Sequence, residues 1–207
     1  MEVLLEPWVE ALGPGQKVRA AGRDLLVRWA EPHRRYHDLR HLAEVLAALR
    51  MLDPDGPATV LCAAYWHDAV YDPAAADNEQ RSALLAADAM GGLGAAPPDI
   101  AEVVRLVLLT ATHRPEPADD AGALLCDADL AVLGSAPERY LQYAADVREE
   151  YAHLGDEAFR RGRAAVLRGL ADRTSLFTTA SGRRRWERPA RENLRAELAR
   201  LDAAPQP

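Results

Sequence analysis

The chain has 207 residues, of which 49% are hydrophobic and 28% are charged, as in an ordinary globular domain and unlike a disordered chain. Its 25 basic and 32 acidic residues give a formal net charge of −7, which argues against a protein built mainly to bind nucleic acid. No apolar run approaches the roughly 18 residues of a membrane span, and residues 1–7 lack the basic region of a secretory signal. We therefore expect a cytoplasmic protein with no membrane partner, in which Cys62 and Cys126 are buried reduced thiols.

Helical periodicity runs through the whole sequence. Apolar residues recur at three- and four-residue spacing, as on the buried face of a helix, in the segments 25–29, 42–49, 100–107 and 194–201. Glycine and proline interrupt this pattern at 13–15, 53–57, 91–94 and 96–99. Asp99 and Asp156 are expected to cap the helices that follow them.

The pattern predicts an all-α protein. No stretch alternates β-branched and aromatic residues with polar ones, so we expect no significant sheet. We expect a single-domain bundle of eight to ten helices over residues 1–201, followed by a disordered tail at 202–207. The arginine run 183–185 is expected to lie in a solvated loop.

The histidines fall at two places that suit a metal site, and helical bundles build such sites from side chains that project inward. His37 and His41 lie four residues apart and would share one face of a helix. His67 and Asp68 close the apolar segment 60–66, which is expected to be a buried helix. An imidazole beside a carboxylate offers nitrogen and oxygen donors to one cation.

Two carboxylates lie in a further apolar run. Burying the charges of Asp127 and Asp129 is costly unless a cation or hydrogen-bond donors compensate them. One divalent cation would compensate one of these aspartates together with His41, His67 and Asp68. The two aspartates are two residues apart on a helix, so they point in different directions and are not expected to be equal ligands. The mixed donors suit Mn²⁺, Fe²⁺, Co²⁺, Ni²⁺ or Zn²⁺ better than Mg²⁺, which prefers oxygen ligands.

The order of these groups resembles the metal site of the HD superfamily of metal-dependent phosphohydrolases. In particular, the chain is similar over residues 29–201 to a bacterial family of predicted HD phosphohydrolases with no assigned substrate. Four motifs carry the likeness: Glu31-Pro32-His33-Arg34-Arg35-Tyr36-His37, Trp66-His67-Asp68-Ala69-Val70-Tyr71-Asp72, Asp77-Asn78-Glu79 and Asp127-Ala128-Asp129-Leu130. The resemblance implies an HD-domain fold in which His41, His67, Asp68 and a late aspartate bind a divalent metal ion. Asp129 is the preferred late ligand because its Ala-Asp-Leu step resembles other HD enzymes, and Asp127 is the alternative.

His37 acquires a role by a second resemblance. The Tyr36-His37 pair followed by His41 is similar to the arrangement in cyclic nucleotide phosphodiesterases. There the first histidine protonates the leaving oxygen, so the likeness implies that His37 is a general acid, for which an unperturbed pKa near 6.5 is suitable. The alternative is a histidine that only hydrogen-bonds Asp38 or a backbone carbonyl.

Further candidates surround these residues. The motif that begins at the His-Asp pair resembles the H-D-x-x-E-D segment of guanosine tetraphosphate hydrolases, with Tyr71 in place of its glutamate and Asp72 as a group that could orient water. Arg34 and Arg40 could clamp a phosphate, or simply lie on a solvated helix surface. His113 could contact substrate or a second metal, or else cap the end of a helix.

The function expected from this set is hydrolysis of a phosphate ester or nucleotide by a metal-activated water. One alternative is a non-catalytic sensor or scaffold of the same fold that binds the metal or a nucleotide. A second is a zinc metallopeptidase, because His37-Asp38-Leu39-Arg40-His41 is a variant of the H-E-x-x-H motif. A third is a di-iron oxygenase, which would need His113 as an additional ligand.

Overall fold

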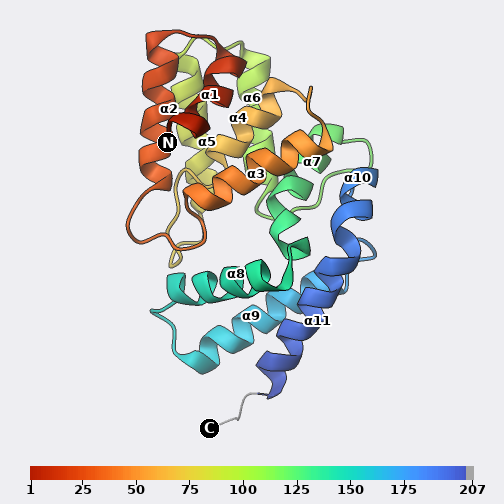
Figure 1. Ribbon diagram of the computed structural model, residues 1–207. Helices are drawn as coiled ribbons and strands as arrows, with labels where there is room; N and C mark the ends of the chain where they lie inside the picture. Colours follow the sequence, from red (N-terminus) through yellow and green to blue (C-terminus); the bar gives the residue numbers. More distant parts are fainter. Residues whose placement is uncertain (204–207) are drawn as a thin grey trace.

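The computed structural model describes residues 1–203, and all regular structure in this range is helical (Figure 1). The elements in chain order are α1 (Glu2–Leu12), α2 (Gln16–Trp29), α3 (Leu39–Leu52), α4 (Ala58–Trp66), α5 (Asn78–Gly92), α6 (Pro97–Leu109), α7 (Asp120–Asp129), the 3₁₀ turn η1 (Leu130–Gly134), α8 (Pro137–Glu150), α9 (Asp156–Ala171), α10 (Ala180–Gly182), the π-helical turn η2 (Arg183–Glu187) and α11 (Arg188–Ala203). The predicted all-α fold is confirmed. With α10, η2 and α11 counted as one continuous segment, residues 1–203 contain ten α-helical segments, within the expected range.

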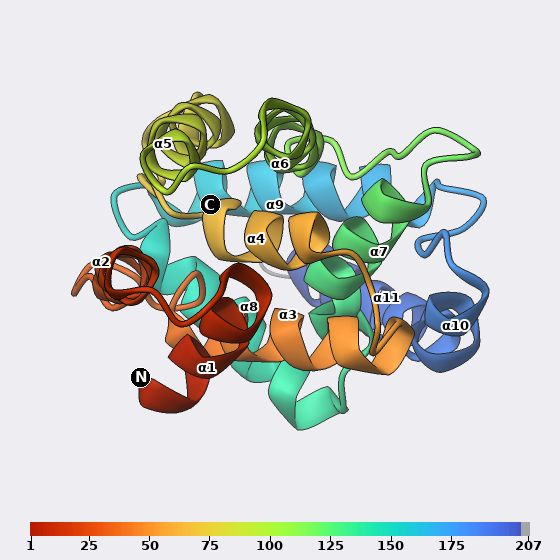
Figure 2. The same cartoon turned by 90° about the horizontal axis from the view of Figure 1, so that it is seen from above.

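Helix α4 lies at the centre of the first half of the molecule. Its sequence is apolar on every side, and a helix with no polar face is stable only when neighbours cover it all round. Accordingly α4 packs against α1, α3, α5, α6 and α7, and Figure 2 shows it enclosed by these helices. The position of α4 determines where His67 and Asp68 lie, because these residues follow directly at its carboxyl end.

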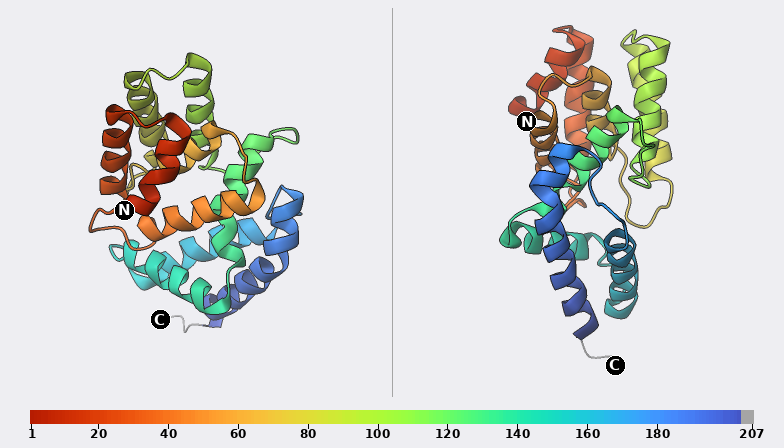
Figure 3. Two further views of the ribbon diagram at one scale, coloured as in Figure 1. Left: turned by 45° about the horizontal axis from the view of Figure 1, so that its top comes forward. Right: turned by 90° about the vertical axis from the view of Figure 1, so that its right-hand side faces the viewer.

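The chain buries two hydrophobic clusters. The first lies among α1 to α7 and includes the fully buried rings of Trp8, Trp29 and Tyr65. The second lies among η1, α8, α9 and α11, and Tyr36 joins it from the segment before α3. The two groups of helices form the two ends of the molecule in Figures 1 and 3, with α3 and α7 between them.

The start of α3 differs from the prediction. The Asp38 carboxylate accepts hydrogen bonds from the backbone amides of Arg40 and His41, so Asp38 is the N-cap and the helix begins at Leu39. Aspartate is among the strongest N-cap residues because it satisfies amides that have no partner within the helix. His37 therefore lies before the helix, and the expectation that it shares a helix face with His41 is wrong.

Two other predicted caps are displaced by a few residues. Helix α6 begins at Pro97 after Ala96, so Asp99 lies in its first turn. Helix α9 begins at Asp156 itself, after Gly155. Proline is favoured at the first helical position because its missing N–H has no acceptor there in any case. Both aspartates still lie near the positive end of the helix dipole.

The C-terminal region is more helical than expected. Residues 183–185 lie in η2 and lead into α11, although all three arginines are exposed as predicted. Helix α11 continues to Ala203, and an ion pair between Asp202 and Arg168 ties its last turn to α9 at 2.7 Å. The predicted disordered tail therefore begins too early at 202, and residues 204–207 lie outside the described part of the chain.

Two simpler expectations are met. Cys62 and Cys126 are both buried and free, and burial raises the pKa of the Cys62 thiol to about 12. Among the helices of residues 1–203, none has both the length and the apolar character needed to cross a bilayer.

Candidate metal centre

Three side chains that are distant in sequence converge between the two halves of the molecule. His41 comes from α3, His67 follows α4, and Asp129 ends α7. The Nε2 atom of His41 lies 3.0 Å from Asp129 Oδ1 and 3.3 Å from the Nε2 atom of His67. One ligand atom from each of the three residues lies within 4.8 Å of the others, an arrangement that could hold a metal ion.

The orientation of His67 suits a metal ligand. Its Nδ1 atom lies 2.9 Å from the Ala64 carbonyl oxygen, which can only accept a hydrogen bond. Nδ1 therefore carries the proton, and in the neutral ring the lone pair is on Nε2, which faces His41 and Asp129. A hydrogen bond from the remote ring nitrogen is the usual way in which proteins fix a ligating imidazole.

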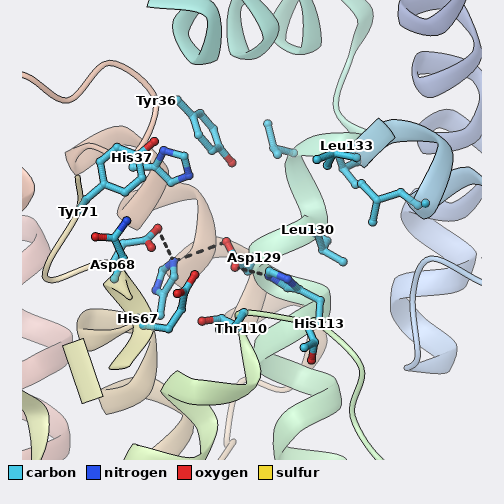
Figure 4. Close-up of a pocket in the computed structure, with 18 of the residues that line it drawn as sticks. Tyr36, His37, His67, Asp68, Tyr71, Thr110, His113, Asp129, Leu130 and Leu133 are labelled. Atoms are coloured by element: carbon cyan, nitrogen blue, oxygen red, sulfur yellow. Dashed lines mark hydrogen bonds and ion pairs between the residues drawn. The ribbon is translucent and has the colours of Figure 1, made fainter. Parts of the chain in front are cut away.

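Asp68 adds a second carboxylate to the cluster. Its Oδ2 atom lies 3.2 Å from His67 Nε2 (Figure 4) and 3.8 Å from His41 Nε2. Burial alone would lower the pKa of His67, but the charges of Asp68 and Asp129 outweigh burial and raise it well above its usual value. Two imidazole nitrogens thus face a strongly negative, buried environment, which is the environment that favours a cation.

His41 shows a further sign of an incomplete site. The residue is 1% exposed, and its Nδ1 atom is buried with no hydrogen-bond partner among residues 1–203. Its Nε2 atom is directed at Asp129. An imidazole whose only polar environment is on the Nε2 side is suited to binding through that nitrogen.

The structure distinguishes the two candidate aspartates of α7. Asp127 accepts hydrogen bonds from the amides of Thr178 and Thr179 and from the Thr179 hydroxyl, all between 2.7 and 2.8 Å. Its carboxylate therefore holds the segment that precedes α10. Asp129, two residues further on, faces the histidines, as preferred from the sequence. Donors and not a cation compensate the buried charge of Asp127.

His113 approaches the cluster from the turn after α6. Its Nε2 atom lies 2.6 Å from Asp129 Oδ2 (Figure 4), whereas His41 lies nearest the other carboxylate oxygen, Oδ1. His113 has a φ of 49°, a left-handed conformation that non-glycine residues rarely adopt. Arg173 donates hydrogen bonds to the carbonyls of Thr112 and His113 and so stabilises this turn. His113 thus reaches the site as a partner of Asp129.

His37 lies at the edge of the cluster and is oriented by a residue that the sequence did not indicate. Its Nδ1 atom donates to Glu150 Oε2 at 2.7 Å, and its ring stacks on Tyr71 with centroids 4.1 Å apart. The same carboxylate accepts the Tyr71 hydroxyl and the amides of Arg35, Tyr36 and His37. In the alternative considered from the sequence, His37 bonds Asp38 or a backbone carbonyl, whereas its Nδ1 atom bonds Glu150 here.

The His37–Glu150 pair is electrostatically coupled. Burial raises the pKa of Glu150, but the hydrogen bond from His37, its positive charge and the backbone amides outweigh burial and bring the pKa to about 2. Burial lowers the pKa of His37, and the hydrogen bond to Glu150 together with the nearby carboxylates reverses this and raises it. His37 therefore retains its proton more strongly than a free imidazole does.

Only one signal in the sequence could have pointed to Glu150. Tyr140, Tyr143 and Val147 recur at three- and four-residue spacing, and Glu150 continues the same buried face of α8. A carboxylate at such a position needs donors in the interior, but the sequence does not say that three of them are amides more than a hundred residues away.

Arg34 and Arg40 do not reach the cluster. The Arg34 guanidinium is buried and donates to Glu31 and to the carbonyls of His37, Asp68 and Ala69. It ties the segment before α3 to the turn after α4 and so sets His37 beside Asp68. The Arg40 side chain is 55% exposed and lies 3.8 Å from Asp146. The expected phosphate clamp is not formed by these two arginines.

Asp72 is also directed elsewhere. Its side chain is exposed and accepts a hydrogen bond from the amide of Ala74, while its backbone is held by Asn78. This is the geometry of a local turn, which aspartate commonly stabilises. Tyr71, but not Asp72, is among the described residues that line the cavity of about 650 Å³ beside the cluster.

A cavity of about 650 Å³ opens beside the cluster. His37, His67, Asp68 and Asp129 line its inner end, and Figure 4 shows His37 and His113 on opposite sides of it. Two arginines that the sequence analysis did not select, Arg114 and Arg173, line the same cavity. Burial and the nearby Arg114 charge lower the pKa of Arg173. The two guanidinium groups supply positive charge at the wall beside His113, because an arginine stays protonated in proteins.

Comparison with known proteins gives no further assignment, since the chain matches no protein-family model, no curated protein and no solved structure. The geometry and chemistry of the described residues therefore have to carry any functional conclusion. A fold alone would not be sufficient in any case, because one fold commonly hosts several activities.

Proposed function

We propose that the protein is a metal-dependent phosphohydrolase that cleaves a phosphate ester or nucleotide by attack of water on phosphorus. The observation that carries this proposal is the convergence of His41, His67, Asp68 and Asp129 at the inner end of a cavity large enough for a small organic ligand. Two imidazoles and two carboxylates are donors that a divalent first-row transition metal accepts.

The donor set suits a cation better than it suits an empty interior. His67 presents its Nε2 lone pair, His41 is buried with polar neighbours only at Nε2, and two carboxylates face both rings. A divalent cation bound here would lower the pKa of water and neutralise charge on the phosphoryl oxygens. Mn²⁺, Fe²⁺, Co²⁺, Ni²⁺ and Zn²⁺ fit these donors, and Mg²⁺ fits less well.

His37 is the proposed general acid. As the ester P–O bond breaks, its electron pair stays on the leaving oxygen, and His37 Nε2 transfers a proton to that oxygen. A new P–O bond forms to the oxygen of water, whose proton passes to solvent. Glu150 holds His37 at Nδ1, which leaves Nε2 as the nitrogen that faces away from the pair. The raised pKa favours the protonated form of His37, which is the form that a general acid needs.

Arg114 and Arg173 are the arginines proposed to contact the phosphoryl group. Both line the cavity on the side of His113. A guanidinium group binds phosphate oxygens through charge-assisted hydrogen bonds. They take the role that the sequence analysis gave to Arg34 and Arg40.

The geometry disfavours the metallopeptidase alternative. In H-E-x-x-H sites two histidines on one helix face bind the metal and the acid between them is the base. Here His37 lies outside α3 and is bonded to Glu150, while the Asp38 carboxylate is used in the helix cap. A metal-binding sensor without turnover is the remaining alternative, and the experiment below distinguishes it from an enzyme.

The test is a screen of the purified protein for release of inorganic phosphate from a panel of phosphate esters and nucleotides, with each of the five transition metals and Mg²⁺. Asp68→Ala is the test variant. Asp24→Ala, an exposed position on α2 far from the cluster, is the matched control. We expect turnover that Asp68→Ala abolishes and Asp24→Ala retains.

Two outcomes would count against the proposal. Activity that survives Asp68→Ala intact would show that the assigned site is not responsible. Metal binding by the wild type with no release of phosphate from any ester would favour the sensor. A casein digest run in parallel reports on the peptidase alternative.

A further inference from the structure

A second cavity, of about 330 Å³, adjoins the first. The two cavities share part of their lining, namely Tyr36, His37, Tyr143, Tyr151 and Val166. His37 therefore stands at the boundary, with the metal cluster on one side and the second cavity on the other. Because His37 is the proposed acid, the leaving group of the substrate, which receives its proton, must lie next to His37.

The second cavity is apolar and aromatic. Besides the shared residues, Phe159 and Leu154 contribute to its wall. The only permanently charged residue among those lining it is Arg163, which is already paired with Glu197 at 2.8 Å and donates to the Tyr143 hydroxyl. An anion gains little in such a place, because the one nearby positive charge is neutralised.

Helix α9 leaves room along this wall. Gly162 lines the second cavity, and a β-carbon built there would meet nothing within 4 Å. Val166, one turn further on, lines both cavities and remains 57% exposed. The protein thus presents an uncovered apolar surface directly beside its proposed acid.

From this arrangement we infer that the second cavity holds the leaving group of the substrate, and that this leaving group is an alcohol bearing an uncharged planar aromatic ring, as a nucleoside does. The phosphoryl group lies at the metal cluster and the ester oxygen at His37. The ring then lies among Tyr143, Tyr151 and Phe159, because aromatic rings pack favourably edge to face or offset against one another. This inference rests on the proposed function.

The substrates for the test differ only in the ring. Adenosine 5′-monophosphate and ribose 5-phosphate share the same leaving oxygen, and only the former has a base. We expect kcat/KM to be roughly tenfold to a hundredfold higher for the nucleotide, the range that base stacking on aromatic side chains provides. The other three common nucleoside 5′-monophosphates are tested alongside it.

Gly162→Leu fills the second cavity without contact with the metal cluster. It should lower kcat/KM for the preferred nucleotide at least about tenfold and change that for ribose 5-phosphate by less than about twofold. Gly91→Leu is the matched control, since Gly91 is also helical with open space around its β-position but is absent from the described lining of both cavities. Ala158→Trp, in the same wall as Gly162, is a second filling variant should Gly162→Leu fold poorly.

A binding measurement separates this inference from the proposed function. Adenosine, guanosine, cytidine and uridine, which have no phosphate, are titrated by calorimetry into the protein without added metal. Binding of at least one of them that Gly162→Leu removes and Gly91→Leu keeps would support the inference even if no ester is hydrolysed.

The inference is overturned if hydrolysis occurs but the nucleotides show no advantage over ribose 5-phosphate. It is equally overturned if Gly162→Leu lowers both activities alike, or if neither turnover nor nucleoside binding responds to filling of the cavity. In the first two cases the phosphohydrolase proposal survives.

Discussion

Replacing Glu150 by glutamine should destabilise the protein in a pH-dependent way. The Glu150 side chain is fully buried, and its pKa falls from 4.5 to about 2 in the folded state. That difference of 2.5 units, at 1.36 kcal/mol each, corresponds to about 3 kcal/mol of stability at pH 7. For a chain of this length the loss lowers Tm by roughly 6–12 °C.

The sign of the pH dependence follows from the lowered pKa. The ionised carboxylate stabilises the fold above the unfolded-state pKa, and this contribution disappears as the pH falls through about 2. The Tm difference between wild type and Glu150→Gln should therefore have its full value at pH 7. At pH 3 it should be less than half as large, as measured by scanning calorimetry.

The neighbouring glutamate provides the control. Glu149 is 64% exposed and pairs with Arg35 at 3.3 Å, so Glu149→Gln should change stability by no more than about 0.5 kcal/mol. Equal effects of the two substitutions, or a Glu150→Gln effect that does not change between pH 7 and pH 3, would refute the reasoning.

Three further outcomes are expected. Asp127→Ala should lower the free energy of unfolding by about 3 kcal/mol in urea denaturation, because it leaves three partly buried donors without an acceptor. Asp129→Asn should instead weaken metal binding at least about tenfold in a titration; the reverse result would exchange their roles. Arg34→Met should also lower the free energy of unfolding by about 3 kcal/mol, and Arg40→Met should lower it by less than about 0.5 kcal/mol, as measured by chemical denaturation. Saturating Zn²⁺ or Mn²⁺, at about 100 times its Kd, should raise the wild-type Tm by roughly 5–10 °C and leave that of His67→Ala unchanged.

The helical fold could be predicted because its signals are local. Leu42, Val45, Leu46 and Leu49 repeat with the helical period, and all four are buried in α3. The predicted helix boundary is wrong where two local signals compete, as at Asp38. There the spacing of the histidines suggests a helix that includes His37, whereas the capping preference of aspartate starts the helix at Leu39, two residues after His37.

The candidate site was only partly predictable, for a different reason. Histidine and aspartate in apolar surroundings are rare enough to be informative, and His41, His67, Asp68 and Asp129 do converge. Arginine and glutamate are common on helix surfaces, so the sequence does not show which of them turn inward. Arg34 satisfies three carbonyls from two segments, a role that depends on where those segments meet.

The proposed centre lies between the two hydrophobic clusters, and its metal ligands and the carboxylate that orients its acid come from different groups of helices. The cation-binding side chains all belong to the N-terminal group of helices, whereas the carboxylate that steadies the acid arrives on α8, from the other group. A chain whose last helices had not yet docked would have the side chains that bind the ion. It would lack the Glu150 carboxylate that orients His37 as the proton donor. In the proposed enzyme, proton donation by His37 would thus begin only once the C-terminal helices have docked.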